Sequence, residues 1–261
     1  MEMHGMSAVD DTRGPAPHKW LTLAAACVAL FMAILDNLVL NVAIPTINAD
    51  LEPSTAQLQW IISAYTLVFA SLQITAGGLG DRYGRKKFFL AGVAFFSLTS
   101  AATALVDSTE ALIALRALMG IGGALIMPLS LSLIADAFPA EERGKALGLW
   151  SAISVSGLAL GPIVGGFIVE NWTWHWIFLI NVPIGAAAFV LTVLAVRESR
   201  DPSGNTTIDI PGTVSVSAAV GLLTWGLIKA GEEGWSSAMV VGSLVAAAVM
   251  FAVFIAIEQR V

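Results

Sequence analysis

Apolar residues gather in eight blocks along the chain, separated by short polar connections. The blocks cover roughly residues 20–43, 58–79, 88–106, 111–134, 147–169, 176–196, 210–228 and 238–257. A helix of about 20 residues crosses the roughly 30 Å of hydrocarbon in a bilayer. The blocks show no alternation of apolar and polar residues, which would indicate a membrane-spanning barrel. The pattern therefore predicts an all-α, polytopic membrane bundle of eight helices.

The composition excludes an ordinary soluble domain. Hydrophobic residues make up 57% of the chain and charged residues only 12%, whereas soluble domains contain roughly 25% charged residues. The formal net charge of −6 matters less than where the charges lie, and no nucleic-acid surface is indicated. Cys27 is the only cysteine, so the chain cannot build a disulfide or a cysteine-based metal site. A Walker loop and zinc-ligand spacing are also absent, and we expect no enzyme activity, no metal and no cofactor.

The positions of Lys and Arg predict which side of the membrane each connection occupies. Eleven of the thirteen basic residues lie before the first block or after an even-numbered block. These eleven are Arg13, Lys19, Arg82, Arg85, Lys86, Lys87, Arg143, Lys145, Arg197, Arg200 and Arg260. Positive residues concentrate on the cytoplasmic side, so we expect both termini of the chain to be cytoplasmic. Trp172, Trp174 and Trp176 then fall on the outer side, where they are expected to anchor the chain at the membrane interface.

Breaker residues divide the chain into four predicted parts. Residues 197–209 contain Asp-Pro and Ser-Gly-Asn sequences and are expected to form a cytoplasmic linker. The linker separates a six-helix bundle, residues 20–196, from an additional transmembrane hairpin, residues 210–261. Residues 1–19 are polar and lack an apolar region followed by a cleavage site, so we expect them to be a retained cytoplasmic tail.

The loop after the second block, residues 77–87, reads GGLGDRYGRKK. Its glycines allow a tight reversal of the chain, and its basic residues fit a cytoplasmic position. The full pattern also resembles the signature loop of the major facilitator superfamily, G-x-L-a-D-r-x-G-r-k. The resemblance implies that the loop latches the cytoplasmic side of the transporter and takes part in gating. The residues to which it assigns this role are Gly77, Asp81, Arg82, Gly84, Arg85 and Lys86.

Glycines also recur within the block of residues 147–169. Gly157, Gly161 and Gly165 are four residues apart and form one helix face, which another helix can approach closely. Pro162 removes one backbone donor and favours a bend. Together with Gly166, these residues resemble the g-x-x-x-G-P-x-x-G-G motif of exporters in the superfamily, which implies transport in the efflux direction.

Two ionisable residues lie inside the predicted helices. Asp36 is in the outer third of the first block, and Arg116 is about six residues from the outer end of the fourth, so their depths match. A charge in hydrocarbon normally faces the interior of a bundle and has a partner. The residue pattern leaves alternatives open, since Arg116 could extend toward the outer surface and Asp36 could be a buried hydrogen-bond acceptor.

The surroundings of both residues resemble one branch of the superfamily. Residues 35–45, LDNLVLNVAIP, are similar to the L-D-x-T-v-v-n-v-A-l-P signature of the fourteen-helix drug:proton antiporters, with Leu38 in place of Thr. Arg116 and Gly120 match the R-x-x-q-G motif, with Met119 where Gln is common. The resemblance implies a proton-coupling site or substrate cavity formed by Asp36, Asn37, Asn41 and Arg116. It covers essentially the whole chain and implies that a C-terminal six-helix half, or a second chain, completes the cavity.

The resemblance implies a secondary antiporter of a bacterial-type cell membrane, driven by the proton gradient without a cofactor. Small amphiphilic or cationic organic compounds would leave as protons enter. A deprotonated Asp36, with its charged form favoured by Arg116, can bind either a proton or a cationic substrate, and this competition would give exchange. Two alternatives stay open. The chain could belong to an exporter of a specific metabolite, or it could be a non-transporting truncated fragment or scaffold, because it stops after the eighth block.

Overall fold

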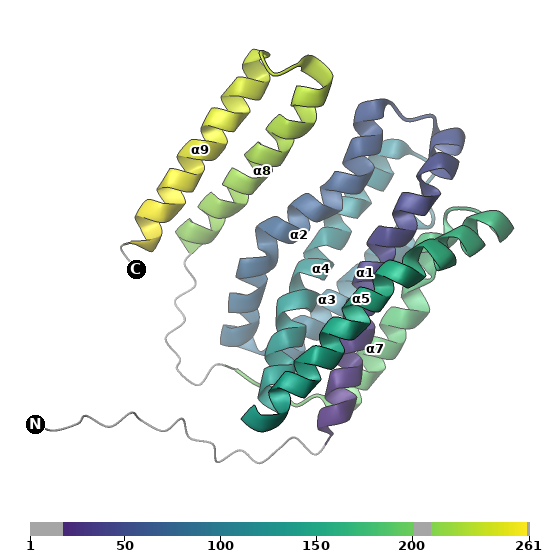
Figure 1. The fold of residues 1–261 in the computed structure, drawn as a ribbon, viewed down its shortest axis with the longest axis vertical. Helices are drawn as coiled ribbons and strands as arrows, with labels where there is room; N and C mark the ends of the chain where they lie inside the picture. The colour runs from purple at the N-terminus through teal and green to yellow at the C-terminus, as the bar shows by residue number, and fades with distance from the viewer. Residues whose placement is uncertain (1–17, 201–209, 260–261) are drawn as a thin grey trace, which may run out of the picture.

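The computed structural model describes residues 18–200 and 210–259, and within these ranges all regular secondary structure is helical. Figure 1 shows the arrangement of the helices. Their bounds are α1 (Lys19–Leu51), α2 (Thr55–Tyr83), α3 (Arg85–Thr103), α4 (Thr109–Ala137), α5 (Ala140–Asn171), α6 (Trp176–Leu179), α7 (Asn181–Ala195), α8 (Ile210–Glu233) and α9 (Ala238–Glu258). Residues 1–17 of the predicted cytoplasmic tail and residues 201–209 of the predicted linker lie outside the described residues, and Lys19 is the first residue of α1.

Each predicted apolar block coincides with a helix, and the block of residues 176–196 is divided into α6 and α7. Among the described residues, seven helical segments are long and apolar enough to cross a membrane, with residues 176–195 counted as one. The helix α3 is outside this set because its first three residues are basic and lower its hydropathy. Seven of the eight predicted crossings thus have the length and hydropathy of a membrane span, and α3, the eighth, packs against α4 and α7 within the same bundle. The all-α membrane bundle is confirmed.

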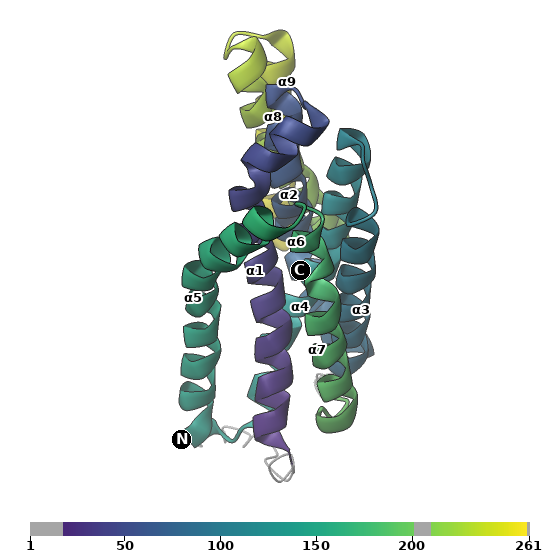
Figure 2. The same cartoon turned by 90° about the vertical axis from the view of Figure 1, so that its right-hand side faces the viewer.

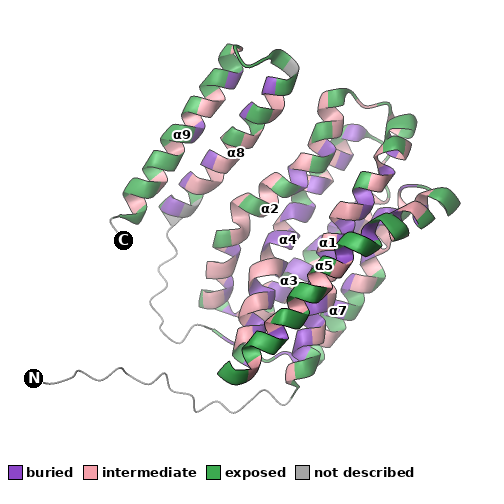
Figure 3. Cartoon of the chain, viewed as in Figure 1, coloured by how far each residue is buried: buried purple, intermediate pink, exposed green. Residues whose placement is uncertain are grey.

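The helix α1 occupies the centre of the bundle. It packs against α4, α5 and α7, and Figure 2 shows it between α5 and α7. Its buried side includes Met32, Val39 and Ala43, none of which is exposed to solvent. The burial colouring in Figure 3 shows the same concentration of buried residues in the interior of the bundle. A polar side chain on the inner face of α1 is therefore surrounded by protein on several sides.

The hairpin of α8 and α9 lies at one edge of the bundle, beside α2 (Figure 1). The Ser217 hydroxyl donates a hydrogen bond of 2.5 Å to the backbone carbonyl of Ser71. The rings of Trp60 and Trp225 pack with a centroid distance of 5.2 Å. The hairpin thus joins the bundle through α2, whereas the main packing partners of α1 are α4, α5 and α7.

Candidate functional site

A buried ion pair joins α1 to α4. Arg116 Nη1 donates to Asp36 Oδ2 at 2.5 Å, and both side chains are 0% exposed. Arg116 also donates from Nε to the backbone carbonyl of Ile61 in α2 at 3.3 Å, and from Nη2 to Asn37 Oδ1 at 3.1 Å. A charge removed from water is tolerated only when it is paired and hydrogen-bonded, and this guanidinium meets both conditions. Arg116 therefore faces the protein interior and does not extend to the outer surface.

The second oxygen of the same carboxylate is held from α7. Asn181 Nδ2 donates to Asp36 Oδ1 at 2.8 Å and to Ser100 Oγ in α3 at 3.0 Å. The Ser100 hydroxyl in turn donates to the backbone carbonyl of Phe178 at 2.8 Å. Asn181 was not predicted as a site residue. The available signal was an amide side chain inside the apolar block of residues 176–196, where an unpaired polar group is unfavourable.

The depth predicted for Asp36 is corrected by the length of α1. The apolar block ends near residue 43, but the helix continues through Pro45 to Leu51. Asp36 consequently lies near the middle of the helix and not in its outer third. The pairing with Arg116 follows from the packing of α1 against α4.

Asn41 stands apart from the other predicted members of this site. Its Nδ2 donates to the backbone carbonyl of Asn37, one turn earlier, at 3.2 Å, and its side chain is exposed. The structure therefore brings together Asp36, Asn37 and Arg116, and leaves Asn41 outside the network.

A recess of about 480 Å³ lies beside the ion pair, between α1, α2, α4 and α5. Its lining includes Asn37, Tyr65, Phe69, Gly123, Trp150 and Ser154. Two of these residues also contact Arg116: Asn37 through its hydrogen bond, and Tyr65 through its ring, whose centroid lies 4.7 Å from the guanidinium carbon. Asn37 and Tyr65 thus lie between the recess and the Asp36–Arg116 ion pair and contact both.

The three glycines of α5 lie against α1. A Cβ atom on Gly157 would meet the side chain of Ile34, and one on Gly161 would overlap that of Leu38. A Cβ on Gly165 would lie 3.1 Å from Val42 Cβ. This is the close helix approach that their spacing predicted. Gly166 and Pro162 belong to other faces of α5, since a Cβ on Gly166 would have no atom within 4 Å and Pro162 is exposed.

The predicted gating loop forms the sharp connection between α2 and α3. Gly84 adopts φ +127°, a conformation that favours glycine. Arg85 Nε lies 2.6 Å from Asp81 Oδ1, and Arg85 Nη1 lies 4.0 Å from Asp136 Oδ1 in α4. The guanidinium of Arg82 covers the ring of Tyr83 at 5.4 Å. Asp81 and Arg85 are thus paired within the loop, and Asp136 extends the charged cluster.

Glu198, which was not predicted, closes the N-terminus of α3. Its two carboxylate oxygens accept hydrogen bonds from the backbone N–H groups of Lys86 at 3.0 Å and Lys87 at 3.2 Å. The N–H of Arg85 donates to the carbonyl of Ser199 at 2.9 Å. An acid at a helix N-terminus satisfies free N–H groups and interacts favourably with the helix dipole. The segment after α7 thereby holds the end of the signature loop, residues 85–87, in place.

Replacing Glu198 with alanine is expected to lower the free energy of unfolding by about 1 kcal/mol, the usual contribution of an N-terminal cap. Glu198→Gln should lose less, since one oxygen acceptor remains. Thermal unfolding of the purified variants in one detergent measures the difference. Equal stability of the Glu198→Ala variant and the unmodified protein would contradict a capping role.

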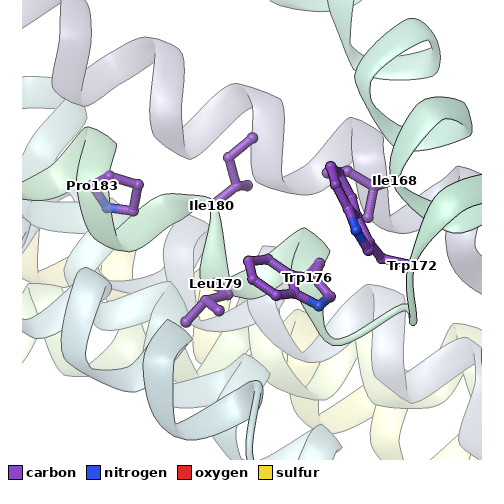
Figure 4. Close-up of a pocket in the computed structure, with 6 residues that line it drawn as sticks. All are labelled: Ile168, Trp172, Trp176, Leu179, Ile180 and Pro183. Carbon is purple, nitrogen blue, oxygen red and sulfur yellow. The ribbon is translucent and has the colours of Figure 1, made fainter.

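The tryptophan cluster, which the sequence predicts to lie on the outer side, divides into two kinds of residue. Trp172 and Trp176 are 52% and 46% exposed, and with Ile168, Leu179, Ile180 and Pro183 they line the apolar outer groove shown in Figure 4. Trp174 is only 1% exposed, and its Nε1 donates to Asp50 Oδ2 at 2.8 Å. The expectation of three interfacial anchors is therefore corrected: Trp174 is a core residue that ties the segment before α6 to the end of α1.

Comparison with known proteins identifies relatives of the chain. It is 41% identical over 241 residues to the tetracenomycin C resistance and export protein of Streptomyces glaucescens, a match that covers 92% of this chain and 45% of that protein. It is 38% identical over 241 residues to the multidrug resistance protein Stp of Mycobacterium tuberculosis, again with 92% and 45% covered. The chain thus spans about half the length of the relatives it matches.

Solved structures show the same fold at low sequence identity. The proton:xylose symporter XylE bound to 6-bromo-6-deoxy-D-glucose matches with a TM-score of 0.62 and 15% identity, over 94% of this chain and 54% of that one. The profile of the Major Facilitator Superfamily matches residues 26–259. The motifs, the helical bundle and this match over nearly the whole sequence lead to one conclusion: the chain belongs to the Major Facilitator Superfamily.

Proposed function

We propose that the chain is the N-terminal part of a proton-coupled antiporter of the fourteen-helix branch, which exports small organic compounds. The observation that carries the proposal is a buried carboxylate–guanidinium pair beside a recess large enough for a small molecule. Relatives named for multidrug resistance and antibiotic export support the efflux direction. The proton gradient drives the exchange, and the remaining helices of the transporter complete the cavity.

Asp36 is the proton-binding group in this mechanism. Its carboxylate is fully buried, so a substrate in the recess does not touch it. A proton and a substrate therefore do not compete directly for this carboxylate, although the sequence led us to expect that they would. Proton binding and substrate binding are instead coupled indirectly. Protonation of Asp36 removes the negative partner of Arg116, whose contacts with Asn37 and Tyr65 then rearrange. Because both residues line the recess, a proton and a substrate each favour a different arrangement of the same side chains.

The signature loop acts as the inner latch of the transporter. The charges of Asp81, Arg85 and Asp136 are placed to hold helix ends together in one state and to separate in the other. Access to the recess then alternates as helical bundles move relative to one another. The distribution of basic residues supports a cytoplasmic position for this loop and for both termini, in a multi-pass protein of the bacterial cell membrane.

Export of one specific metabolite is the second candidate. It is favoured by relatives named for a single compound, such as the tetracenomycin C resistance and export protein. A panel of antibiotics and metabolites, tested in a host that lacks its own exporters, distinguishes the candidates. Resistance to several unrelated compounds supports multidrug export, and resistance to one supports the dedicated exporter.

Inverted membrane vesicles test proton-coupled export. Vesicles that contain the full-length transporter should accumulate a substrate identified in the panel when their lumen is acidified. A protonophore should abolish the accumulation. Accumulation that persists without a proton gradient would contradict antiport.

A further inference from the structure

The recess has the size and chemistry of a binding site for a small organic molecule. Its volume of about 480 Å³ falls within the roughly 300–1,000 Å³ of ligand pockets. Aromatic groups come from Tyr65 and Phe69 in α2 and from Trp150 in α5. Hydroxyl and amide groups are spread among the apolar side chains, at Asn37, Thr66, Ser151 and Ser154. Such a lining suits a flat aromatic compound that also carries hydrogen-bonding groups.

The lining offers no negative charge to a ligand. Every residue that lines the recess is uncharged, and all of them lie in the described part of the chain. Asp36, which precedes the lining residue Asn37, has a 0% exposed side chain, and its two oxygens accept hydrogen bonds from Arg116 and Asn181. Burial of an organic cation without a counter-charge costs the loss of its hydration. This half of the cavity therefore gives a cation no electrostatic compensation from a carboxylate.

The ring of Tyr65 provides little compensation either. Cations bind to the faces of aromatic rings, but the ring of Tyr65 is already covered by Arg116 and stacked on Phe69, with a centroid distance of 5.7 Å and an interplanar angle of 11°. A positive charge also lies beside the recess, because the Arg116 guanidinium contacts two lining residues, Asn37 and Tyr65. Protonation of Asp36 would leave this positive charge unbalanced. A cationic ligand is thus disfavoured in both protonation states.

We propose that the recess binds uncharged, planar aromatic compounds and discriminates against organic cations of the same shape. This inference rests on the proposed function, in which the recess belongs to the export pathway. It narrows the expected substrates from amphiphilic or cationic compounds to uncharged aromatic ones. It also assigns the discrimination between uncharged and cationic compounds to the side of the cavity formed by α1, α2, α4 and α5.

Acridine and N-methylacridinium form a suitable pair of probes, because they share a three-ring frame and differ by a methyl group and a permanent charge. Binding to the full-length transporter in lipid nanodiscs is measured by fluorescence at mildly alkaline pH, where acridine is uncharged. Acridine should bind on the order of tenfold more tightly. Equal or tighter binding of N-methylacridinium would overturn the inference.

Two pairs of variants locate the binding and the selectivity. Trp150→Ala should weaken acridine binding, whereas Trp172→Ala, in the outer groove, should leave it unchanged. Thr66→Asp places a carboxylate in the recess and should reverse the preference toward N-methylacridinium, while the near-isosteric Thr66→Val should not. An acridine affinity unaffected by Trp150→Ala, or an unchanged preference in a folded Thr66→Asp variant, would overturn the assignment of the recess.

The binding assay needs no proton gradient, so its failure is distinguishable from failure of the proposed function. Proton-driven export of N-methylacridinium, combined with its tighter binding, would leave the antiporter intact and refute the substrate class. Selective acridine binding without any proton-coupled transport would support the recess assignment and refute the antiporter.

Discussion

Replacing Asp36 with asparagine is expected to abolish proton-coupled export and to destabilise the protein by about 3–5 kcal/mol. The variant removes the proton-binding carboxylate and leaves the fully buried guanidinium of Arg116 without its negative partner. Export in acid-loaded inverted vesicles measures the first effect, and thermal unfolding of the purified protein measures the second.

The double variant Asp36→Asn with Arg116→Gln separates these two effects. Removing both charges relieves the unpaired guanidinium, so much of the lost stability should return. Export should nevertheless remain absent, because no titratable group stands at position 36. If the double variant regains both stability and proton-driven export, the pair is structural and its assignment to coupling is wrong.

Alanine at Gly161 is expected to destabilise the protein by about 1–3 kcal/mol more than alanine at Gly166. Each substitution adds one methyl group and the same gain in helix propensity, so the difference between the variants isolates packing. At position 161 the new methyl group would overlap the side chain of Leu38 in α1, and at position 166 it would meet no atom within 4 Å. Thermal unfolding of both variants in the same detergent checks the difference. Equal stabilities would show that α5 does not pack on α1 through this face.

The sequence placed correctly those residues whose position is set by helix spacing alone, or whose charge must have a partner in the hydrocarbon region. Charges in hydrocarbon must find partners, so Asp36 and Arg116 could be expected to meet. Glycines four residues apart define a packing face by helix geometry alone, and the contacts of Gly157, Gly161 and Gly165 with α1 follow from it. The apolar blocks located the helices for the same reason, since their length is fixed by the bilayer.

The residues that were missed depend on tertiary neighbours that no local pattern specifies. Asn181 is 145 positions from Asp36, and Glu198 is 112 positions from Lys86. A lone amide or a surface acid carries no periodic signal, and its partner is known only once the helices are packed. Trp174 illustrates the same limit, because its ring is buried while Trp172 and Trp176, two residues away on either side, are exposed.

Proton release on substrate binding shows whether Asp36 exchanges its proton for a substrate. A recess-binding substrate is added to the full-length transporter in weakly buffered nanodiscs over a series of starting pH values, and the released protons are measured with a pH-sensitive dye. We expect proton release from the unmodified protein within a limited pH range and none from the Asp36→Asn variant. Equal release from the variant, or no release from the unmodified protein at any pH, would contradict an exchange of substrate and proton through Asp36.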